Sequence, residues 1–172
     1  MNAEKMTQKA MEALEAAHAD AVRKGHPELT TLHLLHALLE QEHGLTGNLL
    51  GKMGKDPGIL QQAVSEELGK LPTFNGASGR VAASGGMNQV LVRSDDEAKQ
   101  LGDEYVSVEH LLLAILEEGK SGPAGRLLQE HSIHRKELLK TLEDVRGGQR
   151  VTNRNPEDTF EALEKYGSDL TL

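Results

Sequence analysis

The amino-acid sequence predicts an all-α fold of two pseudo-symmetric four-helix repeats, packed into one domain and followed by a connector helix. The composition favours helices that pack through aliphatic side chains, because Leu, Ala, Glu and Lys dominate and only 2% of the 172 residues are aromatic. No alternating apolar and polar pattern of useful length indicates a strand. The third observation, an internal repeat, gives the number of units.

The repeat is clearest in two segments that lie 77 residues apart, His33–Glu40 (HLLHALLE) and His110–Glu117 (HLLLAILE). The same offset aligns Thr7 with Ser84, Leu14 with Leu91, Ala21 with Ala98 and Gly25 with Gly102. After one inserted residue, Leu49 and Leu50 align with Leu127 and Leu128, and Leu60 aligns with Leu138. An alignment that keeps its register over this length indicates two copies of one unit.

Capping and stop residues predict four helices in the first unit. They are expected from Thr7 to near Gly25, from Thr30 or Thr31 to about Gln41, from about Thr46 to Met53, and from Asp56 to about Lys70. Asp56 followed by Pro57 combines an N-cap with a proline at the first helical position.

The second unit repeats this plan. Its helices are expected from about Ser84 to Leu101, from Ser107 to Glu118, from Ala124 to Glu130, and from His134 to Arg146. The pair Gly147 and Gly148 then ends the last helix.

These signals divide the chain into four parts. We expect the first repeat over residues 1–72, a mobile Gly/Ser-rich linker over 73–86, the second repeat over 87–147, and a connector over 148–172. Neither repeat has enough helix to bury its own apolar faces, so the two should pack together about a pseudo-twofold axis. The connector contains one short helix, from Asn155–Pro156 to Gly167, which is marginal alone, so residues after about Gly148 should be mobile.

Charge and composition exclude several classes of protein. The net charge of −8, with no basic run, argues against nucleic-acid binding. The absence of cysteine excludes disulfides, thiolate catalysis and Cys-type zinc sites. No signal-peptide pattern and no apolar stretch of about 18 residues appears, so we expect a soluble, cytoplasmic protein with no membrane contact.

One segment imitates a phosphate-binding loop. Ala114–Ser121 (AILEEGKS) fits a loose P-loop pattern with Ala in place of the first Gly. A working P-loop follows a strand and opens a helix, whereas this segment ends a helix and carries Glu117 and Glu118. Pro123 then interrupts the helix that should follow. We therefore expect a helix C-terminus here and no usable nucleotide site in the chain.

Histidines give no metal or catalytic motif. His33 and His36 lie three residues apart, as do His131 and His134, but neither pair encloses the glutamate that an HExxH site needs. The alignment of His33 with His110 at the start of equivalent helices favours a structural role. No catalytic triad or carboxylate pair can be argued from spacing, and no metal ligand is assigned.

The repeat motifs resemble the Clp N-terminal repeat of AAA+ protein-remodelling machines. The segment RGGQRVT, followed by NPEDTFEALEKYGSDLT, is similar to the stretch that joins this domain to the first ATPase module in the ClpB family of disaggregases. The resemblance implies an ATP-driven homohexamer that engages unfolded or aggregated proteins together with the DnaK chaperone system. ATP would bind in AAA+ modules outside this chain, which by itself needs no cofactor and should be a monomer.

The resemblance also implies a polypeptide-binding surface that includes Thr7, Asp103 and Glu109, with Leu91 in an adjoining apolar groove. The alternative roles are structural, since Thr7 is an N-cap, Glu109 complements a helix dipole and Asp103 is a solvated loop charge. As exposed charges, Asp103 and Glu109 should be replaceable by Ala with little effect on melting. Arg93 and His110 stand where some relatives carry apolar groove residues.

Two other functions remain open from the sequence. The chain resembles, more distantly, the N-domain of a protease-coupled Clp unfoldase that recruits adaptor proteins. It would also suit a free-standing two-repeat regulatory protein, although the abrupt end at Leu172 in a connector argues against this.

Overall fold

The computed structural model describes residues 3–41, 44–74, 80–147 and 151–152, and over these ranges it confirms the all-α fold. The first repeat holds a 3-10 turn, η1 (Ala3–Lys5), and helices α1 (Gln8–Arg23), α2 (Thr31–Glu40), α3 (Leu45–Lys52) and α4 (Pro57–Gly69). The second holds α5 (Gly85–Gln100), α6 (Val108–Glu118), the 3-10 turn η2 (Gly119–Ser121), α7 (Pro123–Glu130) and α8 (Arg135–Arg146). Each predicted helix of the two repeats is present, with ends within about two residues of those expected.

Equivalent residues cap equivalent helices. The Thr7 hydroxyl accepts a hydrogen bond from the Ala10 amide (3.2 Å) at the start of α1, and the Ser84 hydroxyl accepts one from Met87 (3.1 Å) at the start of α5. Gly25 and Gly102 follow the ends of these two helices with φ of +69° and +74°. This left-handed conformation favours glycine, which explains why both repeats end the helix with that residue.

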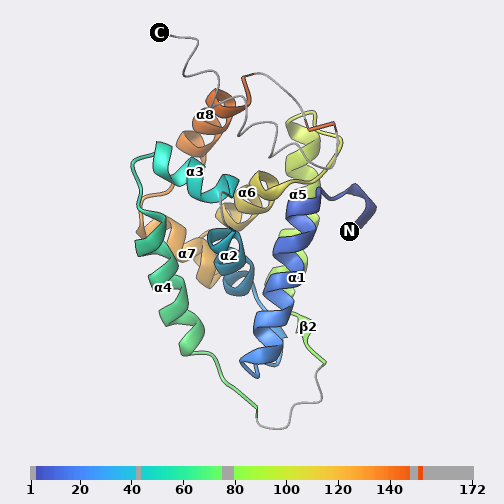
Figure 1. Ribbon diagram of the computed structural model, residues 1–172, viewed down its shortest axis with the longest axis vertical. Coiled ribbons are helices and arrows are strands. Elements are labelled where there is room, and N and C mark those ends of the chain that lie inside the picture. Colours follow the sequence, from blue (N-terminus) through green and yellow to red (C-terminus); the bar gives the residue numbers. More distant parts are fainter. Residues whose placement is uncertain (1–2, 42–43, 75–79, 148–150, 153–172) are drawn as a thin grey trace.

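The second helix of each repeat forms the centre of the molecule. In α2 every residue from Thr31 to Leu39 is buried, and in α6 every residue from Val108 to Leu116 is buried. The other helices surround this pair (Figure 1). An apolar helix without a polar face suits this central position, because all its sides meet protein.

Two short parallel pairings join the repeats, and neither was predicted. Strand β1 (Glu28–Leu29) pairs with β2 (Ala82–Ala83), which lies within the expected linker. The second pairing is a bridge between Met6 and Val106. At the 77-residue offset Met6 aligns with Ala83 and Val106 aligns with Leu29, so the two pairings are equivalent. Each repeat therefore gives the segment before its first helix to the other repeat's loop between its first two helices.

Buried apolar residues from both repeats form one continuous core. The largest fully buried side chains include Leu34, Leu35, Leu38, Leu49 and Leu50 from the first repeat, and Met87, Leu111 and Leu112 from the second. Burying a side chain of this size contributes roughly 1.5–3 kcal/mol, which is an upper estimate for a real unfolded chain. The interface between the repeats is thus part of the core.

The connector begins differently from expectation. Val151 is fully buried and belongs to the core, so the expectation that residues after about Gly148 are mobile is wrong at this position. The predicted connector helix from Asn155 to Gly167 lies outside the described residues. Within the described ranges, no helix is both long and apolar enough to cross a membrane.

Candidate functional site

The three polar residues expected on a binding surface are buried. Thr7 is 0% exposed, Asp103 8% and Glu109 1%. The expectation that Asp103 and Glu109 are exposed charges is wrong. The reason for expecting their replacement by Ala to change melting little is therefore lost. Leu91 is partly buried and packs against the core. A binding role for these four residues stays a prediction, but the polar three offer no open surface to a polypeptide.

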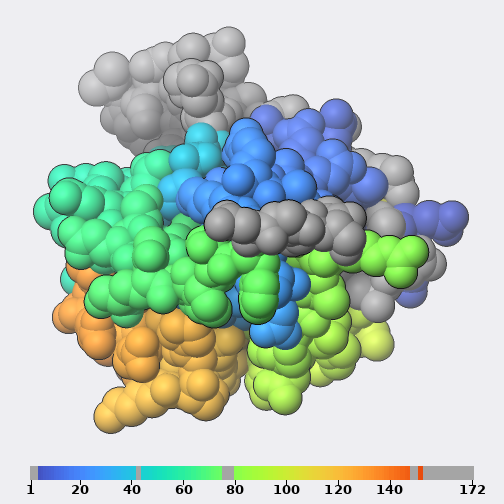
Figure 2. All heavy atoms as spheres, turned by 90° about the horizontal axis from the view of Figure 1, so that it is seen from below, coloured from blue at the N-terminus to red at the C-terminus, as the bar shows by residue number. Residues whose placement is uncertain are grey.

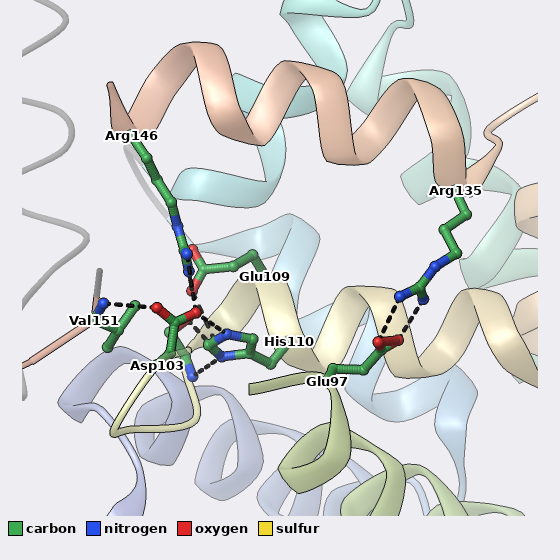
Figure 3. Close-up of polar contacts among 8 residues, drawn as sticks. Glu97, Asp103, Glu109, His110, Arg135, Arg146 and Val151 are labelled. Carbon is green, nitrogen blue, oxygen red and sulfur yellow. Dashed lines mark hydrogen bonds and ion pairs between the residues drawn. The ribbon is translucent and has the colours of Figure 1, made fainter. Parts of the chain in front are cut away.

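Asp103 lies at the centre of a buried polar network between α5 and α6 (Figure 3). Its Oδ2 atom accepts hydrogen bonds from His110 Nε2 (2.7 Å) and pairs with Arg146 Nη1 (2.9 Å). Its Oδ1 atom accepts a hydrogen bond from the Val151 amide (2.9 Å). Burial opposes ionisation of Asp103, but these partners outweigh burial and lower the pKa of the carboxyl below its ordinary value.

Glu109 shares the same cation. One of its carboxylate oxygens lies 3.2 Å from Arg146 Nη2. Complete burial raises the pKa of Glu109, although His110 and Arg146 favour its charged form. We call Asp103, Glu109, His110 and Arg146 the ion cluster; all four side chains are buried.

Ser107, His110 and Asp103 form a chain of contacts that resembles a catalytic triad. The Ser107 hydroxyl lies 3.0 Å from His110 Nδ1, and His110 Nε2 contacts Asp103. However, His110 Nδ1 already accepts a hydrogen bond from the Ser107 backbone amide (2.8 Å), and Ser107 is fully buried. This geometry is a helix capping box, in which no substrate reaches the hydroxyl.

The first repeat has the same capping box with a different partner. His33 Nδ1 accepts from the Thr30 amide (3.0 Å), and His33 Nε2 lies 2.7 Å from His26 Nδ1. Burial, with His26 beside it, lowers the pKa of His33 to about 4. The expected structural role of the aligned histidines is confirmed. Among the described residues, no group of three or more His, Cys, Asp or Glu is placed to hold a metal ion.

An open groove lies between α5 and the end of α6. Its volume is about 620 Å³, and its lining includes Val92, Arg93 and Asp96 of α5 with Glu117 and Glu118 of α6. Figure 2 shows it as the hollow between the yellow-green surface of α5 and the gold surface after α6. Leu91 is not among the lining residues, but its neighbours in the sequence are. The sequence did not single out Val92, which is 61% exposed.

The P-loop-like segment forms one wall of this groove. As expected, it ends a helix, because α6 stops at Glu118. The Glu118 carboxylate accepts hydrogen bonds from the Gly125 amide (3.0 Å) and the Thr31 hydroxyl (3.0 Å). Pro123 begins α7 and does not interrupt a helix. A carboxylate thus occupies the helix start at which a phosphate would bind.

Arg146 and Val151 are the site residues that sequence reasoning missed. The repeat alignment held one signal, since the offset of 78 places Arg146 opposite Leu68. A charged residue at an apolar position, like Glu109 opposite Leu32, indicates a buried pair. Val151 gave no signal, because it lies in a segment with the composition of a linker.

The comparisons with known proteins agree on the domain. A sequence model of the Clp repeat (R) N-terminal domain family matches residues 5–131. The chaperone protein ClpB of Nitratidesulfovibrio vulgaris is 49% identical over 173 residues, which cover 99% of this chain and 20% of that protein. ClpB of Bacillus anthracis is 43% identical with the same coverage. The chain thus spans about a fifth of the length of these relatives.

Solved structures show the same fold. The Hsp104 N-terminal domain from Candida albicans has a TM-score of 0.77 at 24% identity, covering 89% of this chain and 99% of that one. The N-terminal domain of ClpV1 from E. coli has a TM-score of 0.72 at 22% identity, covering 84% and 87%. With the duplicated helical unit and the sequence match taken together, the chain belongs to the Clp repeat (R) N-terminal domain family.

Proposed function

We propose that this chain is the substrate-engaging domain of an ATP-dependent protein disaggregase, and that it binds unfolded or aggregated polypeptide in the groove between α5 and α6. The observation that carries the proposal is the open groove itself, with the exposed Val92 in its lining. An extended or helical segment could cover Val92 while its backbone and polar side chains meet the charged walls.

The comparisons support peptide binding by this fold. One solved relative with a TM-score of 0.63 and 21% identity is a complex of the ClpV N-domain with a VipB peptide. The two ClpB relatives, 49% and 43% identical to this chain, are described as chaperone proteins, which favours an unfolded client for this chain. A relative described as the N-terminal domain of a caseinolytic protease associated chaperone, ClpD, keeps adaptor recruitment as the alternative.

The groove's chemistry predicts weak binding. Its apolar contact is small, and charges surround it, with Arg93 Nη1 only 3.8 Å from a Glu117 oxygen. Covering two or three apolar side chains contributes roughly 1.5–3 kcal/mol each, and lost translational and rotational freedom offsets a comparable amount. We expect dissociation constants of about micromolar or weaker. A disaggregase needs such weak binding because the client must be released for threading.

The proposal extends to the whole protein. ATP would bind in AAA+ modules outside this chain, and the protein would act in the cytoplasm as a hexamer with a DnaK-type partner system. In this arrangement the domain contributes the first contact with a client, and the ATPase modules contribute force.

The groove is tested with a pair of surface variants. Val92→Asp places a charge in the groove, and Ile59→Asp places one at a matched site on α4, where Ile59 is 59% exposed. A permanently unfolded model protein, such as reduced carboxymethylated α-lactalbumin, is titrated against each variant by fluorescence anisotropy. We expect Val92→Asp to weaken binding by about tenfold, which is 1.4 kcal/mol, and Ile59→Asp to have no effect.

Melting curves accompany each titration to show that the variants fold. Equal binding by wild type and Val92→Asp would remove the groove from the site. Binding of a small adaptor protein with no binding of the unfolded protein would favour the alternative function.

A further inference from the structure

We propose that the ion cluster is a docking site for the chain's own connector, which it holds against the domain at Val151. This inference is independent of what the groove binds. It assigns Asp103, Glu109 and Arg146 to an intramolecular interaction.

The contacts of Val151 are those of a docked segment. Its amide donates to Asp103 Oδ1 (2.9 Å), and its carbonyl accepts a hydrogen bond from the Glu104 amide (2.8 Å). Its side chain is 0% exposed and contributes to the core. The loop between α5 and α6 therefore binds both polar groups of the Val151 backbone. Figure 3 shows the bond to Asp103.

Asp103 joins three separate parts of the chain through one carboxylate. His110 comes from α6, Arg146 from the last turn of α8, and Val151 from the connector. Arg146 also reaches Glu109, so the end of α8 is fixed on the same cluster that receives Val151. Because the cluster fixes the chain on both sides of residues 147–150, it sets where the connector starts.

The first repeat is an internal control. At the equivalent positions it carries His26 for Asp103, Leu32 for Glu109 and Leu68 for Arg146, and it folds in the same way. The fold of a repeat thus does not require the ions. Buried ion pairs are often no more stabilising than well-packed apolar residues, so their presence in one repeat alone calls for a specific role.

The residues that follow the last helix of each repeat differ in burial, as expected if the ion cluster holds the one in the second repeat. Phe74 lies five residues after Gly69, the end of the last helix of the first repeat, just as Val151 lies five residues after Arg146, the end of the last helix of the second. Its amide donates to the Gly25 carbonyl (2.9 Å), at the same loop of its own repeat, but its side chain is 60% exposed. Val151, beside the ion cluster, is therefore buried, whereas Phe74, in the repeat without such a cluster, is exposed.

The test replaces three residues of the ion cluster by their counterparts in the first repeat. In the full chain of 172 residues, the triple variant Asp103→His, Glu109→Leu, Arg146→Leu copies the first repeat and removes the acceptor of the Val151 amide. Amide hydrogen exchange is followed by NMR at Val151 and at core positions such as Leu112. We expect Val151 to exchange at least about tenfold faster while the Leu112 amide keeps most of its protection.

A second variant changes no residue of the ion cluster. Val151→Pro removes the donated amide hydrogen and replaces the buried valine side chain by the proline ring. Tryptic cleavage after Arg154 reports release of the connector. Glu97→Gln is the matched control, since Glu97 is a buried α5 carboxylate that binds Arg135 and does not contact Val151. We expect cleavage after Arg154 to accelerate in Val151→Pro and in the triple variant, but not in Glu97→Gln.

Two results would overturn the proposal. One is a folded triple variant whose Val151 amide stays protected. The other is cleavage after Arg154 in Val151→Pro at the rate of the wild-type protein. This second result is decisive even if the triple variant does not fold.

Discussion

His33 and His110 make the same capping contact but differ in the partner of the other ring nitrogen. His33 meets His26, and His110 meets Asp103. The backbone amide donates to Nδ1 in both, so Nε2 carries the ring hydrogen in the neutral form. Nε2 then donates to a carboxylate in one repeat and to a second imidazole in the other. A proton added to His26 Nδ1 would face the His33 Nε2 hydrogen, so the histidine pair disfavours protonation.

The first prediction at this scale is a loss of stability in mild acid. The pKa of His33 is about 4 when folded and 6.5 ordinarily, and that of His26 is also lowered. Between these pH values the unfolded chain binds more protons, so the free energy of unfolding falls as pH drops from 6.5 to 4. The loss from His33 is on the order of 3 kcal/mol at pH 4. Urea unfolding at several pH values measures it.

His33→Gln provides the control, because glutamine also closes a capping box but does not titrate. This variant should show a shallower loss between pH 6.5 and 4. Protonation of Glu109, whose pKa is raised, acts in the opposite direction and is common to both proteins. An unchanged slope in His33→Gln would show that His33 does not couple to stability.

For single residues, the sequence predicted that two aligned residues share a role better than it predicted which residues contact one another. The alignment of His33 with His110 was enough to assign a structural role. The repeat alignment also held a signal for Glu109, which stands opposite Leu32, but none for the burial of Asp103, whose cation Arg146 comes from a helix far along the chain. Loop charges are usually solvated, and only the tertiary structure brings that arginine beneath them.

Among the elements, the corner formed by α6, η2 and α7 depends on glycine. A Cβ atom on Gly125 would lie 2.6 Å from the Gly119 amide nitrogen and 2.7 Å from the Gly119 carbonyl oxygen. These are backbone atoms, which cannot rotate away. A Cβ on Gly122 would lie 1.9 Å from Glu118 Cδ. Gly122 therefore leaves space for the Glu118 carboxylate, which binds the Gly125 amide at the start of α7.

We predict opposite effects for alanine at two equivalent glycines. Gly125→Ala should destabilise the protein by about 1–3 kcal/mol because the added methyl overpacks the corner. Gly47→Ala should stabilise it by about 0.5–1 kcal/mol, since Gly47 lies in α3 with nothing within 4 Å of its added Cβ. Chemical denaturation of both variants measures the signs. Stabilisation by Gly125→Ala would contradict the close approach.

The helices could be predicted from the sequence because their ends carry local signals. Thr7, Ser84, Asp56 and Ser107 all serve as the N-caps expected of them. The strands could not be predicted, since a strand of two residues has no periodicity to detect. Their pairing joins segments far apart in the sequence, and no local rule specifies it.

Considered as a whole, the molecule is built around one core that both repeats share. The core cluster contains both central helices, and the reciprocal strand pairings cross between the repeats. The Thr31 hydroxyl of the first repeat also donates to Glu118 of the second (3.0 Å). The sequence predicted that the repeats pack together, because each lacks enough helix to bury its own apolar face.

The third prediction follows from this shared core. Leu35→Ala and Leu112→Ala should each cost about 2–5 kcal/mol, and each should lower hydrogen-exchange protection equally in both repeats. Calorimetry should show a single transition for both variants. Ile59→Ala, at an exposed site, serves as the control with little expected change. Two separate transitions, or loss of protection limited to the mutated repeat, would contradict a single unit.

The reciprocal strand pairing also bears on the origin of the domain. If one repeat once existed alone, its central helix would have exposed apolar residues, and two identical chains could have covered them by exchanging their leading segments symmetrically. In such a homodimer every mutation occurs twice, so Glu109, Arg146 and Asp103 would have appeared in both halves. Fusion of the two copies into one chain would have allowed the halves to differ, as they now do at Leu32, Leu68 and His26. An ion cluster in one half alone, beside the segment that continues into the connector, is thus possible in a single chain and impossible in a symmetric homodimer.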